Sequence, residues 1–491
     1  MGALRVVAGL GLLLTSGCPG KASLPPPPGL AAHFDYSMPA RFEIPDPRTP
    51  EGQYEVYVGG VLHPTEWPVA LNACASTGGI VEYRWTIDGT AVGSTPDCNG
   101  LVYPFAAEGT YPVSLVVEDR DGETRSHTAD VVVRDYLIFG IGDSYGSGEG
   151  NPDVPASIGA GNTIVPAQWQ NRRCHRSAHA GQVRAAQWLE EVDPHSSVTF
   201  IHLACSGARV QRGLLREYLG IEPDGPPFPP QLDRVAELAA GREIDALVIS
   251  IGGNDVNFSS LIEACILGED CHQSPVDPDP VLQQTIDLIC PRMTPYETEC
   301  VDYFASLLRT PEALDAETIF AVHSTGEDVN GLDVREDGLD DLPDNYRDLA
   351  REIVSALRMD PARVHLTELP DITRNQFGQI CGWPMSPNPA ELAVAAVLQI
   401  PGVTQPELTW ASTSMSVRLR ATMRDAASEH GWQFVEGISN AFFRHGYCSL
   451  DAWLVRLQST FLIQGDAYGA LHPDVAGHGA YAAAIVGSLA H

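Results

Sequence analysis

The chain has 491 residues, 44% of them hydrophobic, which is long enough for two or more domains with a substantial core. Its formal net charge is −33, from 63 Asp and Glu against 30 Lys and Arg. Nucleic-acid binding depends on clustered Lys and Arg that neutralise phosphates, so this balance argues against it. The charge favours solubility and indicates nothing about the substrate beyond a mild repulsion of anions.

The first 18 residues predict an export signal. Arg5 precedes an apolar run, Val6 to Leu14, that is too short to span a membrane and is followed by Thr15-Ser16-Gly17-Cys18. A cysteine directly after small residues is similar to a bacterial lipobox, which predicts lipidation of Cys18; cleavage as a plain signal peptide is the alternative. Residues 19–50 predict a stiff, proline-rich linker. We expect a protein of the bacterial cell envelope or a secreted one, with membrane contact only through the lipid anchor.

Residues 51–134 predict an all-β sandwich, because short runs of alternating polar and apolar residues are separated by turn pairs. Strands and the turns after them are expected at Tyr83–Ile87, Asp88-Gly89, Tyr111–Glu118 and Asp121-Gly122. The segment from Gly109 to Gly122 resembles the end of a polycystic-kidney-disease-type domain. The resemblance implies that Trp85 lies in the core and that the module acts as a spacer or binds surfaces.

From residue 135 to residue 491, apolar runs alternate with helical stretches, which predicts a parallel sheet with helices on both faces. The expected strands are Tyr136–Ile141, Val198–Leu203, Ile244–Ile251, Val364–Leu369 and Trp432–Val435. The expected helices are Ala178–Val192, Pro230–Ala240, Tyr346–Leu357, Ser414–Glu429 and Gly477–Ala490. In open sheets of this kind, ligands bind outside the carboxyl ends of the strands.

A serine and a histidine far apart in the chain form a candidate nucleophile and base. Ser144 stands in Gly142-Asp143-Ser144-Tyr145-Gly146, directly after the first expected strand, where glycines permit a sharp turn and a close approach of substrate. A serine hydroxyl is a poor nucleophile until a neighbour takes its proton, and imidazole suits that task. Two histidines compete for the role: His472, in a loop before a proline, and His478, expected in the first turn of the last helix.

Two further segments offer hydrogen-bond donors at strand ends. The run Ala204-Cys205-Ser206-Gly207-Ala208 follows the second expected strand, and Gly252-Gly253-Asn254-Asp255 follows the third. The tetrahedral intermediate of ester hydrolysis carries its negative charge on one oxygen, which prepositioned amide donors stabilise. The Asn254 side chain and a backbone N–H of the Ala204–Ala208 run are therefore the candidate oxyanion donors. Each segment by itself is more typical of an ordinary turn at a strand end, because Gly and Asn favour turns for conformational reasons.

In this order, the four residues resemble the Ser, Gly, Asn and His blocks of the SGNH, or GDSL, hydrolases. The resemblance covers Asp135 to His491 and extends to secreted actinobacterial-type esterases and lipases, which share Cys174-His175-Arg176-Ser177 and the Ala-Cys-Ser-Gly-Ala run. It implies a three-layer α/β/α domain of flavodoxin-like type that hydrolyses carboxylic esters through an acyl-enzyme, without a cofactor. The matching positions are Ser144 for the nucleophile, His472 for the base, and Gly207, Asn254 and the Ser144 amide for the oxyanion donors.

The residue that orients His472 departs from the family pattern. Many members have an aspartate three residues before the histidine, whereas this chain has Gly469, and its nearest upstream acid is Asp466. Some of the secreted relatives use a backbone carbonyl instead. We therefore expect a Ser-His dyad in which the Gly469 carbonyl accepts from the ring N–H, with a triad through Asp466 as the alternative.

Two other functions stay open. The segment Gly142 to Gly146 also satisfies the Gly-x-Ser-x-Gly elbow of the α/β-hydrolases, although its place on the first strand of the domain argues against that fold. A dinucleotide fingerprint fails, because it would require glycine at Tyr145. The non-enzymatic alternative is a cell-surface binding protein whose second domain is a degenerate hydrolase.

Eleven cysteines less Cys18 leave ten, an even number that predicts up to five disulfides in an exported chain. Sequence fixes no pairing, but the segments favour Cys74–Cys98, Cys174–Cys205 and Cys381–Cys448, and leave Cys265, Cys271, Cys290 and Cys300 unassigned. None shows the Cys-x-x-Cys spacing of zinc sites, so we expect no metal. The expected partner is a small-molecule or lipid ester.

Overall fold

The computed structural model describes residues 29–42, 57–59, 61–159, 164–222, 225–258, 338–381, 404–466 and 468–490. The chain divides into two compact units. One comprises Met1–Tyr36, Ala70–Tyr103 and Thr110–Val131, and the other Ser37–Val69, Pro104–Gly109 and Val132–His491. Cys18 with the expected signal, and Cys265, Cys271, Cys290 and Cys300, lie outside the described residues. None of the described helices is long and apolar enough to cross a membrane.

The N-terminal part is a β-sandwich, as expected. One sheet has the order β5-β4-β7-β8 and the other the order β1-β3-β6. Their strands are β1 (Asp35–Ser37), β3 (Trp67–Asn72), β4 (Ile80–Ile87), β5 (Thr90–Thr95), β6 (Leu101–Phe105), β7 (Gly109–Asp119) and β8 (Thr124–Val133). Asp88 and Gly89 both have positive φ, which permits the two-residue hairpin between β4 and β5. Trp85 is buried in this core, as predicted.

One strand of the expected sandwich range pairs elsewhere. β2 (Tyr57–Gly59) lies antiparallel to β12 at the edge of the sheet of the second unit, with Gly59 opposite Phe200. A three-residue segment is too short for its pattern to indicate which sheet it joins. The sequence therefore did not predict the pairing of this strand.

The second unit is built on a sheet in the order β15-β14-β13-β9-β12-β2. Its parallel strands are β9 (Asp135–Gly142), β12 (Ser197–His202), β13 (Ala246–Ser250), β14 (Val364–Thr367) and β15 (Gln433–Val435). These are the strands expected from the sequence, and their spatial order is the flavodoxin-like one, 2-1-3-4-5. Every residue of β12, β13 and β14 is buried, as in a parallel sheet covered on both faces.

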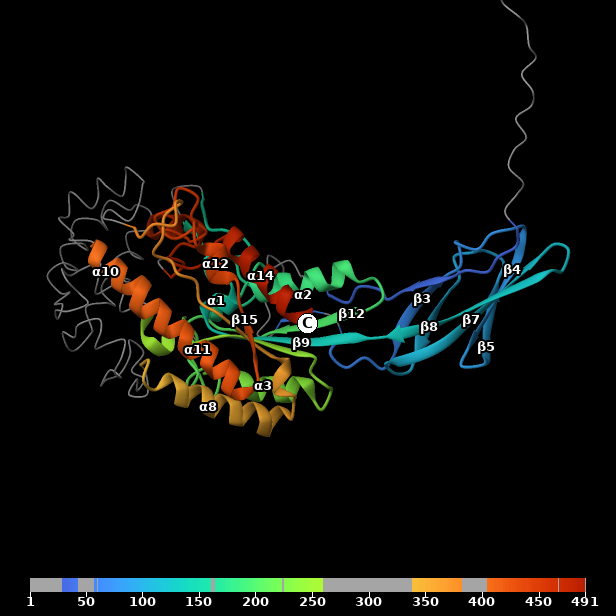
Figure 1. Cartoon of the computed structure of the whole chain (residues 1–491), viewed down its shortest axis with the longest axis horizontal. Coiled ribbons are helices and arrows are strands. Elements are labelled where there is room, and N and C mark those ends of the chain that lie inside the picture. The colour runs from blue at the N-terminus through green and yellow to red at the C-terminus, as the bar shows by residue number, and fades with distance from the viewer. Residues whose placement is uncertain are drawn as a thin grey trace, which may run out of the picture. The chain divides into compact units, whose positions relative to one another are not determined.

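Helices cover both faces of this sheet (Figure 1), which confirms the three-layer arrangement. On one face α2 (Gly181–Val192) packs against α14 (Val475–Leu489), and on the other lie α3 (Gln231–Ala239), α8 (Leu342–Glu352) and α11 (Ser416–His430). The shorter helices are α1 (Ser144–Ser147), η2 (Arg172–Cys174), η3 (Asn254–Val256), η5 (Ile353–Leu357), η6 (Pro361–Arg363), α10 (Gln405–Trp410), η7 (Ala411–Met415), α12 (Ile438–Phe442) and α13 (Leu457–Ile463). A small antiparallel pair is formed by β10 (Ser157–Ile158) and β11 (Ile164–Val165).

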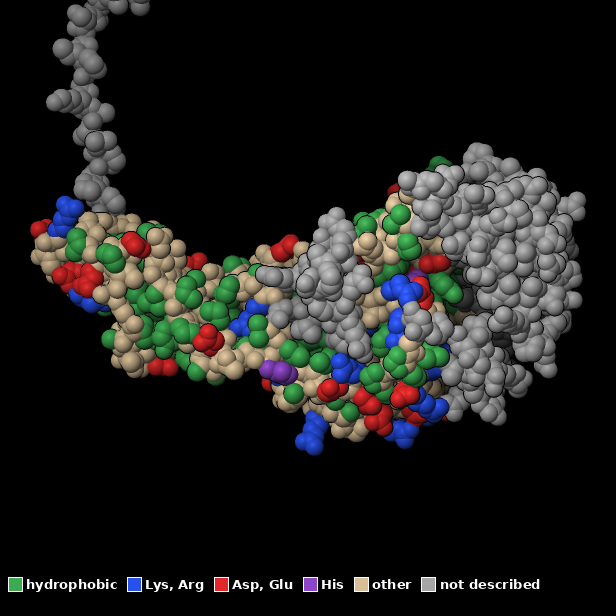
Figure 2. All heavy atoms as spheres, turned by 180° about the vertical axis from the view of Figure 1, so that it is seen from behind, with side chains coloured by type: hydrophobic (Ala, Val, Ile, Leu, Met, Phe, Trp, Pro, Cys, Tyr) green, Lys and Arg blue, Asp and Glu red, His purple; other side chains and the backbone are tan. Residues whose placement is uncertain are grey.

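Basic and acidic side chains lie side by side on the face of the molecule seen in Figure 2. On α8, Arg347 pairs with Asp344 and Arg351 pairs with Asp348, each three residues apart. These pairs neutralise the arginine charges locally.

The order of the strands determines which edge of the sheet carries the candidate site residues. β9 has β12 on one side and β13 on the other. Because the strand order reverses at β9, a crevice is expected outside the carboxyl ends of these strands. Ser144 follows β9, Gly207 follows β12 and Asn254 follows β13. The parallel sheet therefore brings three of the candidate residues to one edge.

The three disulfides expected from the segments are present: Cys74–Cys98, Cys174–Cys205 and Cys381–Cys448. Cys174 and Cys205 are buried, and their bond ties the last residue of η2 to the segment that follows β12. It therefore holds the backbone on which Gly207 stands.

We expect the double variant Cys174→Ser with Cys205→Ser to lose about 4 kcal/mol of unfolding free energy, because the bond closes a loop of 31 residues. Calorimetry of the two variants checks this. The matched control is Cys74→Ser with Cys98→Ser, which lies in the sandwich and should leave the unfolding transition of the second unit in place. Equal loss in that transition from both pairs would contradict the expectation.

Candidate active site

Ser144 stands at a turn that only glycine permits. β9 ends at Gly142, whose φ is +129°, and a Cβ there would overlap the carbonyl oxygen of Ser250 on β13. The chain then passes directly into α1, where the Asp143 side chain caps the helix by accepting from the Tyr145 N–H at 3.1 Å. Ser144 is the first residue of α1 and is buried. The hydroxyl is thus held at the end of the central strand.

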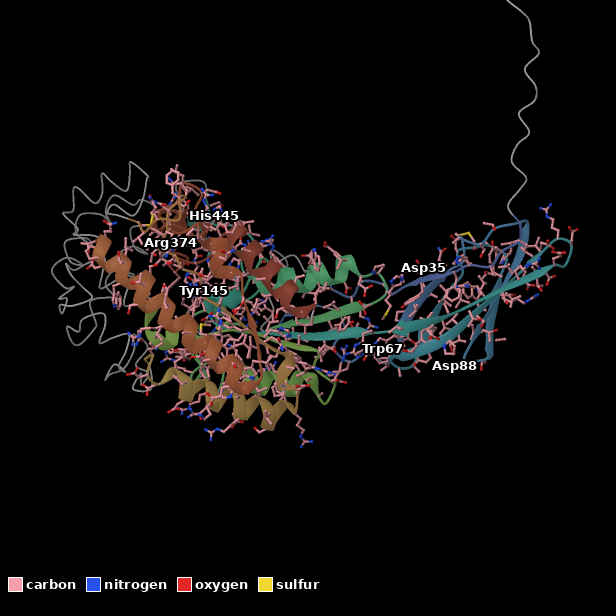
Figure 3. All side chains as sticks on the ribbon, in the orientation of Figure 1. Asp35, Trp67, Asp88, Tyr145, Arg374 and His445 are labelled. Carbon is pink, nitrogen blue, oxygen red and sulfur yellow. A yellow bond between two sulfur atoms is a disulfide. The ribbon has the colours of Figure 1, made fainter. Side chains whose placement is uncertain are left out.

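The structure brings Ser144 and His472 together, although 328 positions separate them. The Nε2 atom of His472 lies 2.8 Å from the Ser144 Oγ. The loop that carries His472 is fixed to α1, because the Tyr145 hydroxyl donates to the Leu471 carbonyl at 3.0 Å. Figure 3 shows Tyr145, a residue of α1, in the interior of this unit. Burial lowers the pKa of His472 below its usual value, so the ring is a neutral base at pH 7.

A backbone carbonyl holds the other ring nitrogen of His472, but not the expected one. Nδ1 lies 3.1 Å from the Ala470 carbonyl oxygen, whereas the Gly469 carbonyl accepts from the backbone N–H of His472 at 3.2 Å. The assignment to Gly469 is corrected to Ala470, because closing the turn before the histidine uses the Gly469 oxygen. Asp466, the alternative, accepts from the Tyr468 N–H at 2.8 Å and from the Gln464 side chain at 2.6 Å.

His478, the competing histidine, lies in the first turns of α14 as expected and has a structural environment. It is fully buried, and its ring nitrogens are 3.3 Å from the Gly181 N–H and 3.2 Å from the Glu149 carbonyl oxygen. Burial lowers the pKa of His478 to about 3. It therefore joins α14 to α2 and to the Ser144 loop as a neutral ring.

The candidate oxyanion donors lie beside each other. The Asn254 side-chain amide donates to the Ala208 carbonyl at 3.0 Å, which places it next to Gly207. The carbonyl of Gly142 accepts from the Cys205 N–H, and that of Ser250 from the Asp143 N–H, so backbone bonds join all three strand ends. Among the described residues, none accepts a hydrogen bond from the N–H of Ser144 or of Gly207. Both amides are therefore available to a substrate oxygen.

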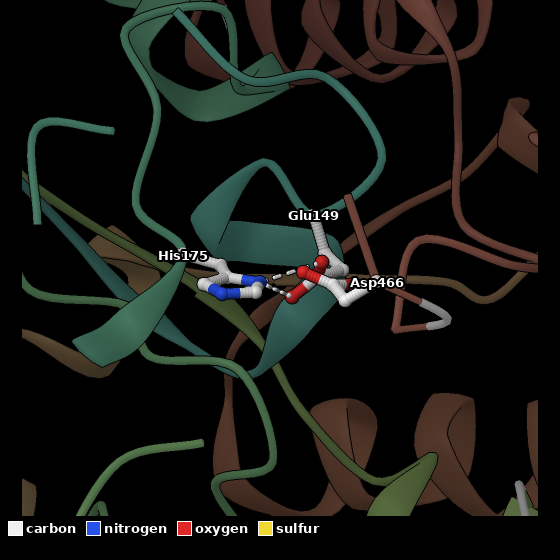
Figure 4. Close-up of side chains that lie close together, drawn as sticks. All are labelled: Glu149, His175 and Asp466. Carbon is white, nitrogen blue, oxygen red and sulfur yellow. Dashed lines mark hydrogen bonds and ion pairs between the residues drawn. The ribbon is translucent and has the colours of Figure 1, made fainter. Parts of the chain in front are cut away.

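A buried polar cluster, which the sequence did not predict, lies behind this site. The Glu149 carboxylate, fully buried, lies 2.9 and 3.0 Å from the Nδ1 of His175 (Figure 4). Its other donors are the Ser206 hydroxyl at 2.6 Å and the Gln464 amide at 2.7 Å. The available signal in the sequence was a glutamate between two glycines, directly after the nucleophile turn. Two glycines so close together indicate positive φ angles and a tightly folded chain, which a solvated loop rarely needs.

The cluster contains one charged pair. Burial alone would raise the pKa of the Glu149 carboxyl, but the His175 charge and hydrogen bond outweigh it and hold this pKa well below its usual range. Burial alone would lower the pKa of His175, and the Glu149 carboxylate raises it above its usual value instead. The indole of Trp169 stacks on the His175 ring with 4.6 Å between centroids. Glu149 is therefore ionised at neutral pH.

Glu149, His175 and Asp466 are the described residues that can hold a metal ion, since their ligand-type atoms lie within 4.8 Å of one another. In the structure, N–H and O–H donors occupy both oxygens of Glu149. These N–H and O–H donors suit a carboxylate in a hydrogen-bond network. They suit a cation less well, because a cation accepts no hydrogen bond from them.

Residues 54–133 match the family model of the PKD domain. Among solved structures, an extracellular lipase from Streptomyces rimosus is 16% identical, with a TM-score of 0.38, over 72% of this chain and 99% of the lipase. A family two carbohydrate esterase from Clostridium thermocellum in complex with cellohexaose is 12% identical, with a TM-score of 0.27, over 93% of this chain and 98% of the esterase. The PKD1 domain of a Vibrio cholerae metalloprotease is 16% identical, with a TM-score of 0.14, over 21% of this chain and 94% of that domain. No curated protein matches the chain by sequence.

Gly207→Ala is expected to displace the Gly207 amide, because a Cβ at this position, where φ is +81°, would overlap the Tyr218 hydroxyl. Loss of one oxyanion donor lowers kcat about 10²- to 10³-fold. The measurement is hydrolysis of a p-nitrophenyl ester. Gly241→Ala is the matched control, because Gly241 has a φ of +88° and no atom within 4 Å of its Cβ position. If both variants lose the same activity, backbone strain rather than a displaced donor explains the effect.

Proposed function

We propose that this protein is an exported serine esterase or lipase that hydrolyses carboxylic esters through an acyl-enzyme. The observation that carries the proposal is the 2.8 Å contact between the Ser144 hydroxyl and the His472 imidazole at the carboxyl edge of the sheet. A nucleophile and a base within hydrogen-bond reach, with the base held by a third group, form the arrangement that activates a serine.

The proposed reaction begins when Ser144 Oγ attacks the ester carbonyl while His472 Nε2 takes its proton. The Ala470 carbonyl accepts from the Nδ1–H and so keeps the tautomer in which Nε2 is the base. The N–H groups of Ser144 and Gly207 and the side chain of Asn254 hold the oxyanion. His472 then protonates the leaving alcohol. Water, activated by the same imidazole, hydrolyses the acyl-enzyme and regenerates Ser144.

Export is part of the proposal. Disulfides form and persist in oxidising compartments, and three of them join described cysteines. We propose a signal peptide over residues 1–18 with lipidation at Cys18, a linker over 19–50, a PKD-type domain over 51–134 and a hydrolase domain over 135–491. Membrane contact is then made only through the lipid, and the substrate is a small-molecule or lipid ester.

Ser144→Ala is expected to reduce the hydrolysis of short p-nitrophenyl esters at least about 10³-fold, because no other group forms the acyl-enzyme. Circular dichroism and the melting temperature should stay close to those of the wild type. Unchanged turnover would refute the assignment. A fluorophosphonate probe should label the wild type and not the variant; if it labels neither, a non-catalytic binding protein becomes the better account.

Asp466→Asn is expected to reduce turnover far less than His472→Ala, because the Ala470 carbonyl, and not Asp466, faces the Nδ1 of His472. Initial rates on the same ester, measured for both variants at equal folded concentration, test the dyad. Equal losses in the two variants would show that Asp466 completes a triad.

A further inference from the structure

A buried carboxylate stands where three active-site loops meet. Glu149 follows the short helix α1, which begins at Ser144, and Gly148 and Gly150 on either side of Glu149 have positive φ, which turns the chain back beneath α1. A Cβ on Gly150 would lie 3.1 Å from the His472 Cβ and 3.0 Å from the Pro473 carbonyl oxygen. The Glu149 segment therefore packs directly against the backbone of the base.

Each donor to the Glu149 carboxylate comes from a segment that carries a site residue. Ser206 precedes Gly207, and its hydroxyl donates at 2.6 Å. Gln464 begins the loop that leads to His472, and its amide donates at 2.7 Å. His175 follows Cys174, whose disulfide partner lies next to Ser206. One carboxylate thus fixes the loops of the nucleophile, an oxyanion donor and the base relative to one another.

The same carboxylate acts on His472 through charge. The negative charge of Glu149 raises the pKa of His472, against the larger effect of burial, and the interaction is mutual. Inside a protein, charges interact more strongly than in water, so a fixed anion near the base stabilises the imidazolium that forms during the reaction. A backbone carbonyl orients a dyad histidine but supplies no full charge. The aspartate of a triad both orients the histidine and supplies a full negative charge.

We propose that Glu149 is a positioning residue of the esterase, one that supplies from behind the active site the fixed negative charge which the Ser144–His472 dyad lacks. The inference rests on the proposed function. Glu149 makes no contact with substrate in this account and acts through His472, Ser206 and Gln464.

Other ionisable groups face the same pair and set the size of the effect. His472 is faced by Tyr145 on α1, His478 on α14 and His175 after η2, while Glu149 is faced in addition by Asp466 and Tyr468. His478 is neutral, and the charge of His175 lowers the pKa of His472. Glu149 is the group among these whose charge raises it.

Glu149→Gln tests the proposal, because it removes the charge and nearly preserves the shape. Without the anion the pKa of His472 falls. His175, which is charged because of Glu149, also becomes neutral, but its opposing effect on His472 is the smaller one, so the acid limb of the pH profile of kcat/KM should still move to lower pH, by about one unit. The imidazolium of the transition state is less stable by the same amount, so kcat should fall about tenfold with little change in KM. Active-site titration with a fluorophosphonate corrects both quantities for the folded fraction.

Glu149→Asp and Asp135→Asn are the matched variants. Glu149→Asp keeps the charge, so its acid limb should stay at the wild-type position even where the shorter side chain reduces kcat. Asp135 is a buried carboxylate at the opposite end of β9, paired with Arg41 and Arg242. Its loss should leave the acid limb in place. A Glu149→Gln profile with an unmoved limb, whatever its height, would overturn the proposal, because a purely structural role lowers the plateau only.

If Glu149→Gln does not fold, His175→Gln decides the question. Glu149 is ionised because the charge and hydrogen bond of His175 outweigh its burial, so without His175 the buried carboxyl binds a proton and the acid limb should move to lower pH, as for Glu149→Gln; an unmoved limb or a shift to higher pH overturns the proposal. A wild-type protein that neither hydrolyses esters nor reacts with the fluorophosphonate would refute the proposed function itself. An active wild type with an unmoved limb in the variants would refute the role of Glu149 alone.

Discussion

The hydrogen bond between Ser144 and His472 requires the C-terminal part of the chain to return to the end of the central strand and to hold the imidazole in a fixed position there. Several bonds impose that return. Helix α14 packs on α2, His478 links α14 to Gly181 and to Glu149, and the Tyr145 hydroxyl holds the Leu471 carbonyl. The backbone of His472 also pairs with Val455. The position of the imidazole is thus determined by contacts made well away from its own ring, which keeps the ring free to exchange a proton.

The price of this arrangement is a set of buried polar groups behind the sheet edge. A carboxylate removed from water costs several kcal/mol unless charged and hydrogen-bonded partners replace the lost hydration. Glu149 has such partners in His175, Ser206 and Gln464, and each of them comes from a different loop. Because a half-satisfied network is unstable, these loops have one low-energy arrangement relative to one another. The site is therefore ordered by the hydrogen bonds of its buried polar groups as well as by apolar packing.

Much of the fold was predictable because its strands are buried on both faces. Runs such as Ala246 to Ile249 are apolar without interruption and are separated by amphipathic helices, a pattern typical of a covered parallel sheet. Three of the cysteine pairs could be assigned from the segments in which they lie. The short edge strand β2 could not be assigned, because three residues carry no periodicity that distinguishes one sheet from another.

At the site, side-chain chemistry was readable and backbone chemistry was not. Ser144 could be singled out because it lies among glycines at the end of an expected strand, as a nucleophile would. His472 could be singled out because it lies in a loop before a proline and can act as a base. The Ala470 carbonyl has no sequence signature, since every residue has one, and only the path of the turn decides which carbonyl meets Nδ1. Glu149 was hidden for a related reason: its flanking glycines read as a loose turn, whereas in the structure they fold the chain tightly enough to bury a charge.

The distance in sequence between the hydroxyl and the imidazole also sets when the chain becomes reactive. A polypeptide is synthesised from its N-terminus one segment at a time, and the serine segment is made 328 residues ahead of the histidine. Until the later segment has docked against α1 and α2, the hydroxyl has no proton acceptor and stays chemically inert. Under the proposed function, the serine is therefore unreactive toward esters until the C-terminal segment has folded onto the sheet.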